Sequence, residues 1–228
     1  MEIYLDSELK SLKNSLLEMF HLVNSQLEKS KEALINFDKD LAREVRVNEK
    51  RVNSLELNID RDVENFLALY NPLASDLRFI IAALKINTNL ERIGDIADGI
   101  AHFVININNK PDDELLKATQ LLEMFDTAIS ILGDVTTAFD DEDSKLARSV
   151  FKRDEFLDEI NLKANEAVAD FIGIHPDKVN QSLYTLSTIR KLERVGDQSK
   201  NIAEEIIFSI EAKVLKHKRK KLKKNPDE

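Results

Sequence analysis

One phrase of this chain occurs twice, and this repetition constrains the fold more than any other feature. Residues 90–101 read LERIGDIADGIA and residues 192–203 read LERVGDQSKNIA, which agree at seven of twelve positions at an offset of 102 residues. Upstream of each copy lies a second related pair, LAREV at 41–45 and LARSV at 146–150. Self-similarity at a fixed spacing indicates two copies of one structural unit. We therefore expect two similar halves.

Each half is predicted to be helical. Only 5 glycines and 4 prolines occur in 228 residues. Few turns imply long elements, and long elements are helices. Apolar residues recur at threes and fours, and prolines follow residues 71, 110 and 175, where they favour new helix starts. The predicted helices cover about 6–36, 38–70 with Asp38 as N-cap, 72–107, 113–139, 140–171 ended by Gly173, and 176 into the basic tail.

The resulting prediction is an all-α fold of six long helices in two tandem, pseudo-repeated antiparallel three-helix bundles. Helices joined by short connections pack antiparallel. We place the first bundle at residues 1–109, the second at 110–212, and a basic tail at 213–228.

Charge and composition exclude several classes of function. Residues 1–212 hold 25 basic against 40 acidic residues, a net charge of −15, which argues against nucleic-acid binding. The tail carries eight Lys/Arg within 213–224 and is either a solvated helix end or a contact for anionic lipid or phosphate. With no cysteine, no signal peptide and no apolar run long enough to span a bilayer, we expect a soluble cytoplasmic protein. No catalytic triad order or glycine-rich phosphate loop occurs, so we expect no enzymatic activity.

The repeated phrase places two carboxylates four residues apart on one helical face. They are Glu91 and Asp95 in the first copy, and Glu193 and Asp197 in the second. Like charges at this spacing destabilise a bare helix by about 0.2–0.5 kcal/mol, so we expect a compensating cation. A glycine precedes each aspartate, at 94 and 196, and costs about 1 kcal/mol relative to alanine. Glycine is tolerable there if a neighbouring helix or a ligand approaches closely.

The preceding helices carry oxygen ligands at the same spacing. These are Glu49 and Asn53 in the first half, and Asp154 and Asp158 in the second. The two groups of each half lie 20 residues before and 21 after the turn near 71, and 19 before and 20 after the turn near 175. In antiparallel helices, equal distance from the turn means equal height. Each bundle is therefore predicted to join four oxygen-bearing side chains, which suit Mg, Ca, Mn or Fe.

With these motifs the chain resembles the PhoU family of phosphate-signalling accessory proteins over nearly its whole length. The resemblance rests on EMFHLVNSQLEKSKEAL at 18–34, NPLASDLRFI at 71–80, and the doubled ERIGD and ERVGD. It implies multinuclear iron, or alternatively Zn, Mn, Mg or Ca, on two acidic clusters. The residues at the motif positions are Glu49, Glu91 and Asp95 in the first cluster, and Asp154, Asp158, Glu193 and Asp197 in the second. Asn53 departs from the pattern, because its amide brings no charge, and we expect a weaker or smaller first cluster.

The resemblance also implies a function. Family members act as negative regulators of the phosphate-starvation response, through contacts with the ATPase of the phosphate ABC transporter and with a membrane sensor histidine kinase. By this resemblance we expect a cytoplasmic, metal-binding adaptor without catalytic turnover. Its contact with the membrane would be indirect, and a homodimer is an additional expectation.

Other interpretations stay open. The acid pairs could be solvated charged faces that Arg92 and Arg194 neutralise, on a plain helical scaffold without metal. The chain could be a helical accessory domain protein of another phosphate transporter. A di-iron oxidase of the ferritin type requires Glu-x-x-His on two helices, and the sequence has this spacing once, at Glu18 and His21.

Overall fold

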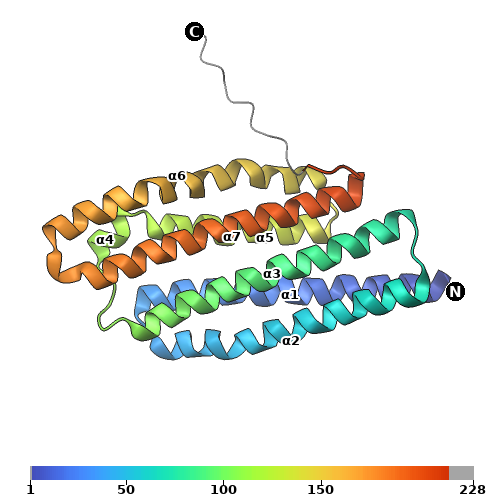
Figure 1. Ribbon diagram of the computed structural model, residues 1–228, viewed down its shortest axis with the longest axis horizontal. Helices are drawn as coiled ribbons and strands as arrows, with labels where there is room; N and C mark the ends of the chain where they lie inside the picture. Colours follow the sequence, from blue (N-terminus) through green and yellow to red (C-terminus); the bar gives the residue numbers. More distant parts are fainter. Residues whose placement is uncertain (1, 216–228) are drawn as a thin grey trace, which may run out of the picture.

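The computed structural model describes residues 2–215, with side chains from Leu5 onward, and this part of the chain is built from helices joined by short connections (Figure 1). The helices are α1 (Glu2–Asn36), α2 (Lys39–Tyr70), α3 (Ala74–Asn106), α4 (Asp113–Ala118), α5 (Leu121–Asp140), α6 (Ser144–Ile174), a 3₁₀ turn (Pro176–Lys178) and α7 (Val179–Glu211). The predicted all-α class and its six long helices are confirmed.

The helices form two antiparallel three-helix bundles that lie against each other (Figure 1). In the first, α1, α2 and α3 pack on one another, and in the second α5, α6 and α7 do the same. Contacts between α3 and α7, and between α1 and α5, join the two bundles. Buried apolar residues of both halves belong to one continuous core, so the repeats form a single packed unit.

Aspartates begin three of the helices. The side chains of Asp38, Asp112 and Asp143 accept hydrogen bonds from the backbone N–H groups at the start of α2, α4 and α6. An N-cap of this kind satisfies helix-terminal donors that otherwise have no partner, which stabilises the helix by about 1 kcal/mol. The prediction of Asp38 as the N-cap of the second helix is confirmed.

Two predicted helix boundaries were wrong. The segment 113–139 is two helices, because Gln120 adopts a left-handed conformation with φ of 53° and separates α4 from α5. Gly173 lies inside α6, which ends at Ile174 directly before His175 and Pro176. Proline disfavours the helical conformation of the residue before it, and here that effect sets the end of the helix.

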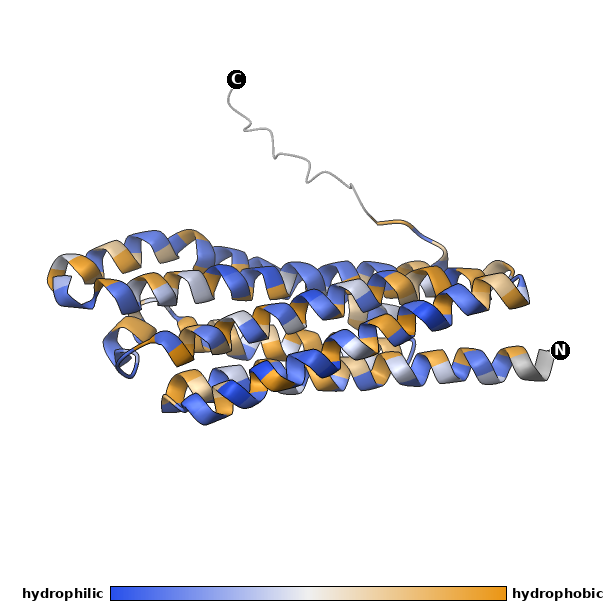
Figure 2. Cartoon of the chain, turned by 60° about the horizontal axis from the view of Figure 1, so that its bottom comes forward, coloured by the Kyte–Doolittle hydropathy of each residue, from blue (hydrophilic) through white to orange (hydrophobic). Residues whose placement is uncertain are grey.

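Hydropathy alternates along the helices. Figure 2 shows hydrophilic and hydrophobic residues mixed along each long helix, as expected for helices that bury one face and expose the other. Within residues 2–215, no helix has the length and apolar character needed to cross a membrane. The expectations for the basic tail concern residues that lie largely outside the described part of the chain.

Candidate metal centres

The two copies of the repeated phrase lie on α3 and α7, at close approaches to a neighbouring helix. A Cβ placed on Gly94 would lie 2.9 Å from Val52 Cγ1 of α2. A Cβ placed on Gly196 would lie 2.6 Å from both Asp154 Oδ1 and Leu157 Cδ1 of α6. Both distances are shorter than real Cβ contacts, so each glycine lets two helices of one bundle pack closely. The predicted reason for a glycine at these positions is confirmed.

In the second bundle, the predicted acids of α6 and α7 meet around a lysine. Lys200 Nζ donates hydrogen bonds to Asp154 Oδ2 at 2.5 Å and to Asp197 Oδ1 at 2.7 Å. Burial raises the pKa of Glu193, and the charges of Asp197, Asp158 and Asp154 raise it further. The charges of four acidic side chains from two helices therefore act on one another, and the Lys200 ammonium lies between two of them, Asp154 and Asp197.

Asp154 is the most deeply placed of these acids. It is 3% exposed, and its Oδ1 atom is buried without a hydrogen-bond partner. Burial raises its pKa, while the hydrogen bond from Lys200 lowers it. A buried carboxylate oxygen without a donor is costly, since burial removes its hydration. A cavity of about 470 Å³, lined by Asp158 and Lys200 among others, opens beside it.

In the first bundle, the predicted residues of α2 and α3 also come together. Asn53 donates a side-chain hydrogen bond to Glu49, and the charge of Asp95 raises the pKa of Glu49 after the larger effect of burial. Burial, followed by the charges of Asp95 and Glu56, raises the pKa of Glu91. The charges of these α2 and α3 side chains thus act on one another, and their convergence on one ion stays a prediction. No lysine equivalent to Lys200 donates to these acids in the described residues.

Several residues of these clusters were missed in the sequence. Glu56 adds an acid next to Glu91, one helical turn beyond Asn53. Arg46 Nε donates to Asp98 Oδ1 at 3.0 Å, and its Nη1 lies 3.2 Å from His102 Nδ1. Its positive charge therefore lies beside the first cluster, where it acts on Glu49. Lys200 is three residues after Asp197 on the same helical face, and this spacing alone was a usable signal.

The donor sets fit a hard cation, but not in the arrangement that the side chains adopt here. Within residues 2–215, no three carboxylate or imidazole side chains converge closely enough to hold one ion. In the second cluster, the Lys200 ammonium takes the place of a cation between Asp154 and Asp197, and a metal ion would have to displace it. The partnerless oxygen of Asp154 is a ready ligand for such an ion. Metal ligation by the eight predicted residues stays a prediction.

The isolated Glu-x-x-His spacing lies away from both clusters. Glu18 and His21 are on the exposed surface of α1, and Glu18 accepts a hydrogen bond from Arg51 Nη2 at 2.6 Å. Within residues 2–215, neither belongs to a group of three or more acidic or imidazole side chains that could hold a metal ion, as a di-iron centre would require. The structure gives the oxidase interpretation no support.

Comparison with known proteins connects this geometry to a family. The model of the PhoU domain matches twice, at residues 16–104 and 121–206, once in each bundle. The chain belongs to the PhoU family. It is 32% identical over 215 residues to the phosphate-specific transport system accessory protein PhoU homolog 1 of Thermotoga maritima, covering 94% of this chain and 92% of that protein. It is 29% identical to the PhoU accessory protein of Escherichia coli K12, covering 93% and 87% of the two chains.

Solved PhoU structures share the fold. The crystal structure of PhoU from Pseudomonas aeruginosa superimposes with a TM-score of 0.85 at 31% identity, covering 91% of this chain and 99% of that one. The regulatory protein PhoU from Streptococcus pneumoniae gives a TM-score of 0.81 at 28% identity, covering 92% and 99%. The resemblance stated from the sequence is confirmed, and the chain is a PhoU-family protein related to accessory proteins of phosphate transport.

Proposed function

We propose that this PhoU-family protein is a cytoplasmic negative regulator of the phosphate-starvation response. It would act as a metal-binding adaptor between the ATPase of a phosphate ABC transporter and a sensor histidine kinase. The names of its relatives, accessory proteins of phosphate-specific transport systems, support the transporter as one partner. A homodimer in solution is part of the proposal.

The observation that carries the metal-binding part is the electrostatic influence of neighbouring acids on one another, once in each bundle, together with the Lys200 ammonium between Asp154 and Asp197. Glu49, Asn53, Glu91 and Asp95 would hold an ion in the first bundle. Asp154, Asp158, Glu193 and Asp197 would hold one in the second. Burial raises the pKa of Glu49, Glu91, Asp154 and Glu193, because the charged carboxylate loses solvation. A cation among these groups offsets that cost.

We propose iron, in a multinuclear cluster, as the metal, with Zn, Mn, Mg or Ca as alternatives. When bound, the metal supplies positive charge and fixed coordination bonds between two helices. The side chains supply the ligands and the balancing charge. The acid pairs of α2 and α3, and of α6 and α7, hold each helix pair at one relative height. Lys200 balances the second cluster by pairing with Asp154 and Asp197 when no metal competes. Metal binding would thereby change the charge and rigidity of the surface that partners meet.

The experiment is a binding assay with the purified transporter ATPase and the cytoplasmic part of the kinase, together with metal analysis by mass spectrometry. The test variant is Glu193→Ala/Asp197→Ala. The matched control is Glu166→Ala/Asp170→Ala, an acid pair with the same spacing on the exposed face of α6. We expect the test variant to lose metal and the control to keep it. Unchanged metal content in the test variant would refute the site, and wild-type protein that binds neither partner would refute the adaptor role.

A further inference from the structure

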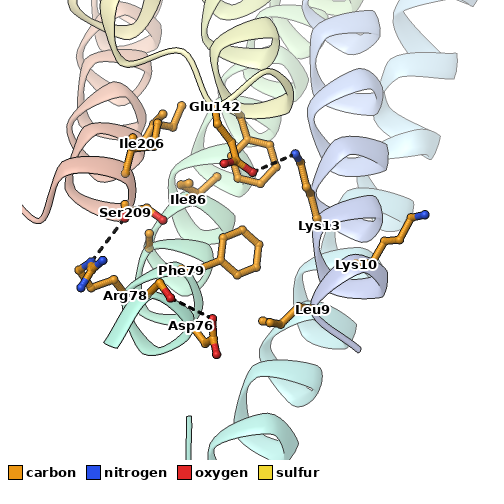
Figure 3. Close-up of a pocket in the computed structure, with 14 residues that line it drawn as sticks. Leu9, Lys10, Lys13, Asp76, Arg78, Phe79, Ile86, Glu142, Ile206 and Ser209 are labelled. Atoms are coloured by element: carbon orange, nitrogen blue, oxygen red, sulfur yellow. Dashed lines mark hydrogen bonds and ion pairs between the residues drawn. The ribbon is translucent and has the colours of Figure 1, made fainter. Parts of the chain in front are cut away.

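The segment NPLASDLRFI at 71–80 has no part in either acidic cluster, yet several of its residues line a cavity between the bundles. Asp76, Arg78 and Phe79 of α3 contribute to a cavity of about 460 Å³ (Figure 3). The other walls come from α1, from the turn after α5, and from the end of α7. Because both repeats supply walls, this site exists only where the two bundles meet.

The inner surface of the cavity is apolar. The Phe79 ring points into the hollow toward Leu9 (Figure 3), and it stacks on Phe139 with ring centroids 6.3 Å apart. Ile86 and Ile206 complete this surface. A volume of this size accommodates one or two bulky apolar side chains, and their burial away from water favours binding.

The rim of the cavity carries cations that lack an acidic partner. Lys13 is paired, since its Nζ lies 3.5 Å from Glu142 Oε1 and donates to the backbone oxygen of Asp140 at 2.7 Å. Lys10 and Arg78 form no ion pair with any described residue. Arg78 Nε only reaches the backbone oxygen of Ser209, at 3.4 Å. Asp76 and Glu142 also line the cavity, so its three cations, Lys10, Lys13 and Arg78, leave one net positive charge there. In a chain with a large excess of acids, a net positive lining favours an acidic ligand.

The surface around the opening favours a protein over a small molecule. Leu73, two residues before the lining residue Ser75, is 72% exposed. Ile210 is 38% exposed and lines the cavity itself. Apolar side chains that surround a pocket extend the contact area beyond what a small ligand covers. An apolar pocket with such surroundings and a charged rim has the composition of a protein-binding hot spot.

We propose that this cavity is a docking site for a protein segment that inserts a bulky apolar side chain and carries flanking carboxylates for Lys10 and Arg78. This inference rests on the proposed function and takes the partner to be the ATPase of the phosphate transporter. The DLR segment, residues 76–78, then serves docking on a surface made by both repeats, and the acidic clusters serve metal binding.

The test measures the dissociation constant between this protein and the purified transporter ATPase. Leu9→Trp fills the cavity, and Lys10→Glu/Arg78→Glu reverses the rim charges. The control Lys152→Glu/Lys163→Glu makes the same change in net charge on the exposed surface of α6. Far-UV circular dichroism and thermal melts verify that each variant folds. We expect at least a tenfold weaker binding for the cavity and rim variants, no change for the control, and a wild-type affinity that falls as salt rises.

The outcomes separate two failures. If wild type binds the ATPase and the folded cavity and rim variants bind equally well, the docking site is wrong while the adaptor role stands. If wild type does not bind the ATPase at all, the adaptor role fails and this inference fails with it. Equal weakening by the rim variant and the control would mean that net charge alone governs association, and it would also overturn the proposed site.

Discussion

Lys200 Nζ donates a 2.5 Å hydrogen bond to Asp154 Oδ2 from the neighbouring helix, and this pair links α7 to α6 at the centre of the second acidic cluster. Burial alone would lower the pKa of Lys200, but its hydrogen bonds to Asp154 and Asp197 outweigh burial and raise the pKa above the ordinary value. The lysine therefore stays charged at neutral pH and occupies the position between two carboxylates that we assign to a metal ion.

Replacing Lys200 separates its contribution to stability, as the donor to buried Asp154, from its competition with a metal ion. We expect Lys200→Met to lower the free energy of unfolding of metal-free protein by about 1–3 kcal/mol, because it leaves Asp154 buried without a donor. The same substitution should strengthen metal binding, since no ammonium competes. Urea denaturation in chelator and calorimetric metal titration measure the two effects. Lys163→Met, at an exposed position of α6, is the control and should change neither quantity.

The packing at Gly196 predicts opposite effects of alanine at two helical glycines. Gly196→Ala puts a methyl group 2.6 Å from Asp154 Oδ1 and Leu157 Cδ1, and we expect a loss of about 1–3 kcal/mol in the free energy of unfolding. Gly133 in α5 has no atom within 4 Å of such a methyl group, so Gly133→Ala should stabilise by up to about 1 kcal/mol. Chemical denaturation of both variants measures this difference. A harmless Gly196→Ala would contradict the close packing of α6 and α7.

Asn53 accounts for the expected weakness of the first cluster. Asn53→Asp restores a second carboxylate four residues after Glu49, and we expect tighter metal binding in the first bundle. Without metal, the added charge near Glu49 should destabilise the protein by less than about 1 kcal/mol, because solvent screens partly exposed groups. Metal titration of the variant and wild type decides this. If Asn53→Asp leaves metal affinity unchanged, Asn53 is not a ligand.

The acidic clusters also predict an unusual pH dependence. The folded-state pKa of Glu193 is raised above the ordinary value of 4.5, first by burial and then by Asp197. Folded protein then binds more protons than unfolded protein, so this residue favours folding below the ordinary pKa and loses that effect as pH rises through the folded pKa. We expect Glu193→Gln to stabilise metal-free protein at pH 7 and to have little effect at pH 4. Urea unfolding at both pH values checks this. An equal change in the free energy of unfolding at pH 7 and pH 4 would contradict the raised pKa of Glu193.

Much of this fold followed from the pattern of apolar residues and prolines. The six long helices and the Asp38 cap were predicted because helical periodicity and capping are local properties of the sequence. The break at Gln120 was missed, since nothing in the neighbouring residues requires a left-handed conformation there. Gly173 was overinterpreted, because the proline at 176 ends the helix more strongly than the glycine does.

The candidate site was predictable in its pairing and not in its charge balance. Equal distances from the turns were sufficient to expect Asp154 and Asp197 near each other, and Lys200 pairs with both of them in the structure. The insertion of Lys200 between these acids depends on side-chain conformation in the packed bundle. The cavity at the DLR segment forms only because the two repeats contact each other, and the spacing of residues along the sequence does not predict that contact.

The most direct test of the central claim is the anomalous scattering of iron-loaded crystals, measured on both sides of the iron absorption edge. The account predicts an iron peak in the second bundle within coordination distance of Asp154, Asp158, Glu193 and Asp197, with the Lys200 ammonium displaced, and a weaker peak beside Glu49, Glu91 and Asp95. Crystals that show no iron at either cluster, with Lys200 still between Asp154 and Asp197, would contradict it.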